Sequence, residues 1–255
     1  TNVRGWSSGE EVTFFPRVTD TTVMTLAVAR WLATDPEHRK ASFINIMTEL
    51  YSKHPECEFS PIMNMWCKSE YFQPFRRDSN DVIARISPIA LKIDDLNEAI
   101  KLAKAATEFT HKDPDSIKGA EVFTDALWKA ARGRSKEDIR FAMENDYGID
   151  LNIPEQDLKS ILMGAVKEDV IINGEPTGEV YYRDTGKIDY STMNTLTAAL
   201  KCFLEGNSYE DIVRRAVALG GDSTTIAQRH TLNSTCNLSL NNTLATHLHR
   251  CCVHR

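Results

Sequence analysis

Two short segments at opposite ends of the chain combine an aspartate with neighbouring hydroxyl side chains. Thr19 and Asp20 stand directly before an apolar run, and Asp222 and Thr225 follow a pair of glycines. Carboxylate and hydroxyl oxygens, with no cysteine or histidine among them, suit a hard cation such as Mg²⁺ or Ca²⁺ better than Zn²⁺. Nearly the whole chain separates the two segments. We therefore expect the fold to bring them together as two halves of one oxygen-lined cation site.

The residues of these segments and their order along the chain resemble motifs of the ADP-ribosylglycohydrolases, the family related to dinitrogenase-reductase-activating glycohydrolase. The family pattern FTDDTVMT is similar to VTDTTVMT at residues 18–25, and LGGDSDT is similar to LGGDSTT at residues 219–225. Between them, RISPIAL at residues 85–91 resembles RVSPIGL, and THKDPDSIKGA at residues 110–120 resembles TH-x-x-P-x-x-I-x-GA. The resemblance is colinear over residues 12–227.

This resemblance implies an all-α fold, a compact single-domain ADP-ribosylglycohydrolase-like helical bundle. We expect the domain to span residues 1–227 and to be shortened at its N-terminus, because the family's opening helix has no counterpart before the first motif. Residues 228–255 depart from the family and are expected to form a divergent tail. The apolar run at residues 22–33 predicts a buried helix, and Gly220 and Gly221 predict the end of another.

The resemblance implies four magnesium ligands, Thr19, Asp20, Asp222 and Thr225. It also makes Asp20 and Asp222 the catalytic carboxylates. Thr21 and Thr224 stand where the family has aspartates. Because uncompensated positive charge in a partly buried site is costly, we expect one Mg²⁺ ion at most. Threonine cannot act as a general base at neutral pH, so the rate of any hydrolysis should also be lower.

Two further stretches are predicted to contact the ADP-ribose part of a ligand. The family's Gly-Asn-Gly loop is replaced here by Ser79-Asn80-Asp81, ahead of Arg85. The resemblance makes Asn80 and Arg85 ligand contacts. Asp81 lacks the conformational freedom of the family's glycine, and it would repel a pyrophosphate unless Arg76 or Arg77 offsets its charge.

Residues 173–178 and 182–190 are polar and rich in turn-forming residues, which predicts loops around a short strand at residues 179–182. In the family, the equivalent region precedes a helix start that faces the substrate. Tyr190 and Ser191 are therefore predicted to contact the ligand, and a plain surface loop is the alternative. His111 is expected to be a buried structural residue.

Composition limits the classes of protein to which the chain can belong. Of 255 residues, 42% are apolar and 26% are charged, which is typical of a globular domain with a large core. No apolar run is long enough to span a bilayer and no signal peptide is visible, so we expect a soluble cytoplasmic protein without a membrane partner. The net charge of −6 argues against nucleic acid as a partner.

The six cysteines show no CxxC pair, and reduced thiols are expected. The tail is dense in zinc-type ligands, with His247 and His249 close to Cys251 and Cys252. Their spacing matches no closed tetrahedral site, so no zinc site is predicted there.

Three functions remain open from the sequence. The first is a magnesium-dependent hydrolase that cleaves the glycosidic bond between ADP-ribose and a protein side chain, arginine or serine, or a small acceptor. The second is a catalytically impaired pseudoenzyme that binds ADP-ribose. The third is a structural or interaction module that needs neither metal nor nucleotide. The first two have an ADP-ribosylated protein or an ADP-ribose-containing small molecule as partner.

Overall fold

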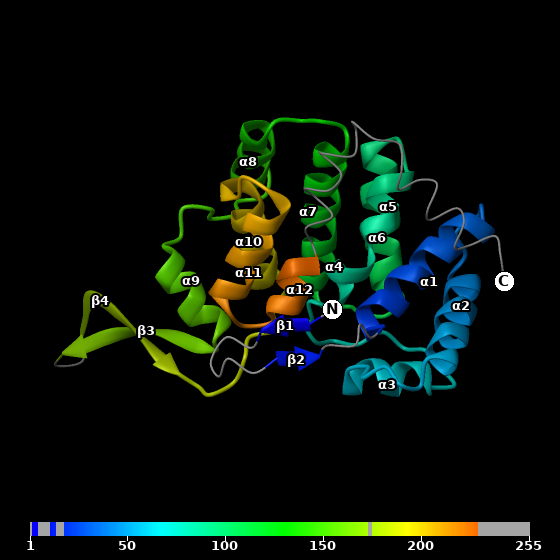
Figure 1. Ribbon diagram of the computed structural model, residues 1–255, viewed down its shortest axis with the longest axis horizontal. Coiled ribbons are helices and arrows are strands. Elements are labelled where there is room, and N and C mark those ends of the chain that lie inside the picture. The colour runs from blue at the N-terminus through cyan, green and yellow to red at the C-terminus, as the bar shows by residue number, and fades with distance from the viewer. Residues whose placement is uncertain (1, 5–10, 14–17, 173–174, 229–255) are drawn as a thin grey trace.

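A computed structural model describes residues 2–4, 11–13, 18–172 and 175–228. Within these ranges the chain forms twelve helices and two antiparallel two-stranded sheets. The prediction of an all-α fold is confirmed, and Figure 1 shows that the helices make up the body of the molecule. None of the described helices is both long and apolar enough to cross a membrane.

The helices, in chain order, are α1 (Asp20–Thr34), α2 (Lys40–Lys53), α3 (Pro61–Cys67), α4 (Asp81–Arg85), α5 (Ser87–Lys92), α6 (Leu96–Glu108), α7 (Pro114–Ala131), α8 (Lys136–Asn145), α9 (Glu155–Leu162), α10 (Thr192–Glu205), α11 (Tyr209–Leu219) and α12 (Ser223–Gln228). The strands are β1 (Asn2–Arg4), β2 (Glu11–Thr13), β3 (Ala165–Ile172) and β4 (Glu175–Asp184).

Helix α7 is the central element of the core and packs against α4, α5, α6, α8 and α10. It begins where the carboxylate of Asp113 accepts hydrogen bonds from the amides of Asp115 and Ser116, with Pro114 at the first helical position. Gly119 lets α10 approach closely, because a Cβ atom at this position would lie 2.1 Å from Cγ2 of Thr192. The start of α10 is therefore held against the first turns of α7.

Helix α1 confirms the buried helix predicted at residues 22–33. Its buried side is formed by Val23, Met24, Ala27, Val28, Trp31 and Leu32. The helix begins at Asp20 because Thr19 caps it: the Thr19 hydroxyl accepts a hydrogen bond from the amide of Thr22 at 3.3 Å. This cap places the half-buried Thr19 and Asp20 at the start of a helix whose remainder is anchored in the core.

The predicted helix end at Gly220 and Gly221 is also confirmed. Both residues have positive φ angles, of 79° and 64°, which glycine adopts without strain. A Cβ atom at Gly221 would lie 2.9 Å from the carbonyl oxygen of Leu162, so the chain also passes close to α9 there. The reversal ends α11 and starts α12 directly after Asp222.

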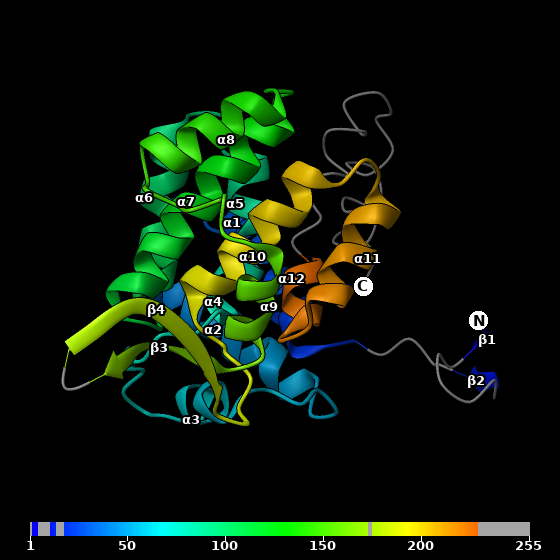
Figure 2. The same cartoon turned by 90° about the vertical axis from the view of Figure 1, so that its left-hand side faces the viewer.

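The long hairpin corrects the loops predicted around residues 179–182. Strand β4 runs from Glu175 to Asp184 and pairs with β3 in a register that joins Ala165 to Asp184. Figures 1 and 2 both show this hairpin projecting from the helical body. The polar residues of this segment favour a loop when only neighbouring residues are considered. In the fold, however, strand pairing with β3 satisfies the hydrogen-bonding groups of its backbone. Residues 173–174 of the expected loop lie outside the described residues.

Candidate metal centre

The N-terminal ends of three helices, α1, α4 and α12, meet at one place in the fold. Helix α4 packs against both α1 and α12, and Figure 1 shows α12 beside α4. The hydroxyl of Thr25 on α1 donates a hydrogen bond to the carbonyl of Ala84 on α4, at 3.3 Å. The amide nitrogen Nδ2 of Asn80, just before α4, donates to Oδ2 of Asp222 at 2.9 Å. The two halves of the predicted site are thus joined through α4. We call the region where the starts of α1, α4 and α12 meet the junction.

Three carboxylates interact at this junction. Burial raises the pKa of Asp20 above its ordinary value of 3.8, the amide and hydroxyl of Thr21 oppose the shift, and the charges of Asp81 and Asp222 add to it. Oδ1 of Asp20 accepts hydrogen bonds from both groups of Thr21, at 2.7 Å from the amide and 3.3 Å from the hydroxyl. The junction therefore concentrates negative charge at a partly buried position.

Asn80 organises the side of the junction opposite α1. The residue is only 2% exposed, and besides Asp222 its Nδ2 donates to the hydroxyl of Thr195 on α10, at 3.2 Å. Its backbone amide donates to the carbonyl of Tyr190 at 3.1 Å. Asp222 is fixed at its other oxygen, Oδ1, by the amide of Thr225 at 3.2 Å. Both oxygens of Asp222 are thus oriented before any ligand arrives.

Tyr190 and Ser191 lie next to this junction, at the start of α10. The Tyr190 side chain is 53% exposed, while its carbonyl holds Asn80. Ser191 is fixed by Asp189, whose carboxylate accepts from its amide at 3.0 Å and from its hydroxyl at 2.9 Å. The structure thus brings both residues beside Asn80, with the Tyr190 ring facing solvent.

Arg85 occupies a different environment from the other predicted ligand contacts. Its side chain is fully buried, and Nη2 donates to the hydroxyl of Thr110. Its Nε and Nη1 atoms have no hydrogen-bond partner among the described residues. Burial lowers the pKa of Arg85 to about 10. Because solvent does not reach the guanidinium, a direct nucleotide contact would require the surrounding core to open.

His111 is buried beside Arg85, in keeping with the structural role expected for it. Its Nδ1 lies 2.8 Å from the hydroxyl of Thr110, and its Nε2 has no partner among the described residues. Burial lowers the pKa of His111 to about 3, and the positive charge of Arg85 adds to the shift. The imidazole is therefore neutral at physiological pH.

A family model for ADP-ribosylglycohydrolases matches residues 3–228. The chain belongs to the ADP-ribosylglycohydrolase family. A solved structure described as an "ADP-ribosylglycohydrolase-related protein complex" is similar to it with a TM-score of 0.60 and 22% sequence identity, over 86% of this chain and 71% of that chain. That likeness supports the ADP-ribosylglycohydrolase fold, and the family membership supports a glycohydrolase-like activity.

The residues at the junction fit the divalent cation on which ADP-ribosylglycohydrolases rely. The described side chains around it carry oxygen donors, namely the carboxylates of Asp20, Asp81 and Asp222 and the hydroxyl of Thr19, and the charges of Asp81 and Asp222 act on Asp20. Such a set favours a hard cation. Thr21, which replaces a family aspartate, turns its hydroxyl toward Asp20 as a hydrogen-bond donor. The side chain of Thr224 lies outside the described residues.

Two aspartates near this junction were not among the site residues predicted from the sequence. Asp81 was considered only as a source of repulsion, and its closeness to Asp20 depends on how α4 packs against α1. Asp78 accepts hydrogen bonds from the amide and hydroxyl of Thr192 and from the hydroxyl of Ser116 at 3.0 Å. It therefore ties the starts of α7 and α10 together. Its partners are too distant in sequence for a local pattern to reveal them.

Proposed function

We propose that this chain is a magnesium-dependent ADP-ribosyl glycohydrolase, which hydrolyses the bond between the ribose of ADP-ribose and an arginine or serine side chain or a small acceptor. The observation that carries the proposal is the hydrogen bond from Asn80 to Asp222 just before α4, a helix that packs against α1, with the charges of Asp81 and Asp222 acting on Asp20. This junction combines negative charge with oxygen donors at a site that solvent can still reach.

In this proposal one Mg²⁺ is held by Thr19, Asp20, Asp222 and Thr225, with Asp81 as an added carboxylate. Three carboxylates offset the two positive charges of one Mg²⁺ ion, but not the four positive charges of two Mg²⁺ ions. Asp81 thus compensates in part for the carboxylates that Thr21 and Thr224 lack. When bound, the cation would orient the ribose hydroxyls and stabilise charge that develops during hydrolysis.

The protein's own groups have separate tasks in the reaction. Asp20 or Asp222 takes a proton from the attacking water, since a general base needs a carboxylate within hydrogen-bond reach. Asn80 holds Asp222 in one orientation, and the carbonyl of Tyr190 accepts a hydrogen bond from the backbone amide of Asn80. Holding reactants in a productive geometry is itself a large part of catalysis.

The direct test is the release of ADP-ribose from ADP-ribosyl-arginine and ADP-ribosyl-serine peptides by the purified protein. We expect turnover that EDTA abolishes, that added Mg²⁺ restores, and that Asp20→Asn and Asp222→Asn variants lack. Absence of turnover at high enzyme concentration, with both peptides and with Mg²⁺ present, would contradict the proposal.

One observation favours a second candidate, a binding module without catalysis. The hydroxyl of Thr21 donates a hydrogen bond to Oδ1 of Asp20, where a cation would otherwise bind. In that case ADP-ribose would bind in calorimetry with an affinity that does not change when Mg²⁺ is removed. Strong magnesium dependence of ADP-ribose binding would exclude this second candidate.

A further inference from the structure

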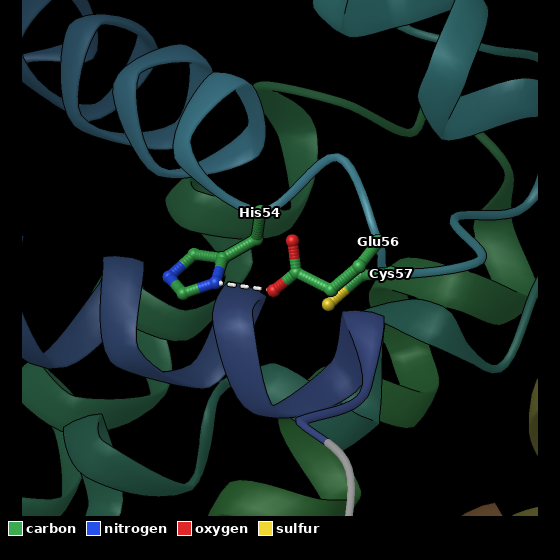
Figure 3. A group of neighbouring side chains, drawn as sticks. All are labelled: His54, Glu56 and Cys57. Atoms are coloured by element: carbon green, nitrogen blue, oxygen red, sulfur yellow. Dashed lines mark hydrogen bonds and ion pairs between the residues drawn. The ribbon is translucent and has the colours of Figure 1, made fainter.

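A second group of metal-ligating side chains lies in the loop between α2 and α3. His54, Glu56 and Cys57 each turn one donor atom toward the others, and these three atoms all lie within 4.8 Å of one another. Nδ1 of His54 is 3.0 Å from Oε1 of Glu56. Figure 3 shows the Glu56 carboxylate between the His54 ring and the Cys57 sulfur. The group thus combines an imidazole, a carboxylate and a thiol.

The backbone of this loop is held in place independently of any ligand. The amide of Cys57 donates to the carbonyl of His54 at 3.1 Å, which closes the turn that brings the two side chains together. The next turn is closed by the amide of Phe59, which donates to the carbonyl of Cys57 at 3.0 Å. Phe59 is buried and its ring packs 4.9 Å from that of Tyr51. The positions of His54 and Cys57 are therefore fixed by the fold.

Burial differs across the three side chains in a way that leaves one side open. Cys57 is buried, and its thiol donates to the carbonyl of Val18 at 3.2 Å. His54 is half-buried, whereas the Glu56 side chain is 62% exposed. A cation can therefore enter from the Glu56 side and contact this exposed carboxylate first. Ligand distances of about 2.0–2.3 Å are then reached by movement of side chains alone.

We propose that His54, Glu56 and Cys57 form a binding site for Zn²⁺, with water as the fourth ligand. Three protein ligands and one water give the tetrahedral coordination that zinc adopts in open sites. Binding breaks the S–H bond of Cys57, releases its proton to solvent and forms a sulfur–zinc bond through the electron pair left on sulfur. The Nδ1 atom of His54 binds with its lone pair, while the ring proton resides on Nε2.

This site differs from the junction at Asp20 in its donors, although the two are neighbours. Val18, whose carbonyl accepts from Cys57, immediately precedes Thr19 and Asp20 in the chain. Sulfur and imidazole nitrogen select soft or borderline metals, while the oxygen set at the junction selects hard ones. The chain would thus hold two different metals at adjacent places, and the zinc site does not depend on the proposed hydrolysis.

Cobalt(II) is the probe for this proposal, because it substitutes for zinc and its absorption spectrum reports coordination by a thiolate. The full chain, reduced and stripped of metal, is titrated with Co²⁺ in the presence of excess Mg²⁺. We expect a sulfur-to-cobalt charge-transfer band in the near ultraviolet that Zn²⁺ displaces. The Cys57→Ser variant should lack this band, and His54→Gln and Glu56→Gln should weaken Co²⁺ binding about tenfold or more.

Two control variants separate this site from other metal-binding groups of the chain. Asp20→Asn should leave the band unchanged, because the junction supplies no sulfur. A Cys251→Ser, Cys252→Ser double variant tests the cysteines of the tail and should also leave it unchanged. A band that survives in Cys57→Ser, or one that disappears only in the tail variant, would overturn the proposal. His54→Gln and Glu56→Gln change partly exposed side chains, so they test the site even if Cys57→Ser folds poorly.

Discussion

At the scale of single residues, Asp20 is subject to opposing demands. Burial raises its pKa and the charges of Asp81 and Asp222 add to that shift, while two hydrogen bonds from Thr21 stabilise its ionised form. The protein therefore holds more negative charge at the start of α1 than its own groups offset. A bound cation removes this conflict, because it favours the ionised form of each carboxylate near it.

Replacing Asp81 by asparagine tests its part in the site. Removal of an outer-shell partner typically weakens metal binding about 10–100-fold, so loss of a ligand carboxylate should weaken Mg²⁺ binding at least tenfold in calorimetry. The exposed Asp146 provides a matched control, since Asp146→Asn removes the same charge elsewhere on the surface. Equal Mg²⁺ affinity in the wild-type protein and Asp81→Asn would show that Asp81 is not a ligand.

Restoring the family's carboxylates is the complementary experiment. The Thr21→Asp, Thr224→Asp double variant supplies two negative charges at positions where the family pattern has them. We expect tighter Mg²⁺ binding and faster release of ADP-ribose, because the added charge can offset a second ion. If the double variant binds Mg²⁺ no better than the wild-type protein, the position assigned to the site is wrong.

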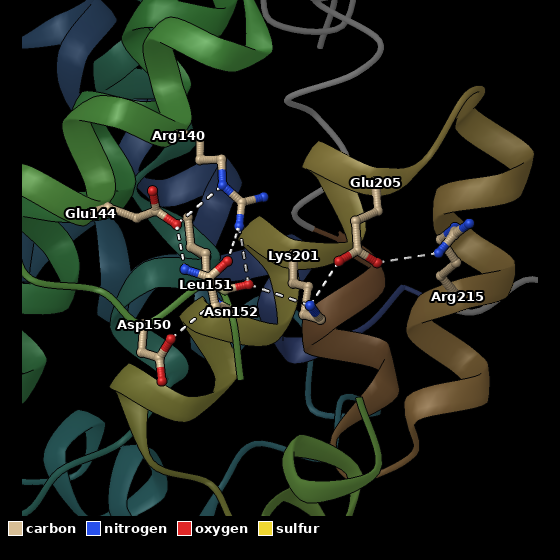
Figure 4. A network of polar contacts seen from close by, with 8 residues as sticks. All are labelled: Arg140, Glu144, Asp150, Leu151, Asn152, Lys201, Glu205 and Arg215. Atoms are coloured by element: carbon tan, nitrogen blue, oxygen red, sulfur yellow. Dashed lines mark hydrogen bonds and ion pairs between the residues drawn. The ribbon is translucent and has the colours of Figure 1, made fainter. Parts of the chain in front are cut away.

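At the scale of elements, helix ends rather than helix bodies build the functional regions. Thr19 caps α1, Asp222 caps α12, and Asp78 connects the starts of α7 and α10. Further from the site, α10 is held by a polar network that Figure 4 shows. Nζ of Lys201 donates to the carbonyl of Leu151 at 3.3 Å and pairs with Glu205 at 2.7 Å. Glu205 also pairs with Arg215 on α11 at 3.4 Å.

This network predicts a measurable contribution of Lys201 to stability. The Lys201 side chain is only 13% exposed, so Lys201→Met removes a largely buried donor from the carbonyl of Leu151 and from the carboxylate of Glu205. We expect a loss of about 1–3 kcal/mol in the free energy of unfolding, measured with urea. Lys53→Met is the control, because Lys53 makes the same i,i+4 pair with Glu49 at 62% exposure. Its effect should stay below about 0.5 kcal/mol. If Lys201→Met and Lys53→Met lower the free energy of unfolding equally, burial of the Lys201 network does not add to stability.

At the scale of the whole molecule, the site couples metal binding to folding. The folded state binds protons to Asp20 more tightly than the unfolded state does, since the pKa is raised above 3.8. Stability of the metal-free protein therefore falls as pH rises from the unfolded pKa through the folded one, and the penalty persists at neutral pH. A cation that binds only the folded protein reverses this penalty and adds its own binding free energy.

Thermal unfolding of the Asp20→Asn variant checks this coupling. Because asparagine carries no charge and can still accept the bond from Thr21, we expect a higher melting temperature than wild type in EDTA at pH 7. In the wild-type protein, Mg²⁺ should raise the melting temperature, and in the variant it should have little effect. At a pH well below 3.8 the difference between the two proteins in EDTA should vanish. A variant that is less stable than wild type in EDTA would contradict the raised pKa.

Much of the fold was predictable because its signals are local. The buried face of α1 and the helix end at Gly220 follow from side-chain period and glycine conformation, which act over a few residues. The same short patterns carried the resemblance to the family, and the matching family model confirmed it. The prediction for the hairpin was wrong because strand pairing joins β3 to β4, and no local pattern in the sequence indicates that these two segments pair.

The sequence by itself determined the family, the helical class of the fold and the two ends of the chain that carry Asp20 and Asp222. Only the tertiary structure decided that Asp81 joins them, that Asp78 ties two helices together, and that Arg85 is buried away from solvent. It also decided that His54, Glu56 and Cys57 face one another. The physical reason is that charge interaction, burial and ligand geometry depend on distance in space, which packing sets and local sequence does not encode.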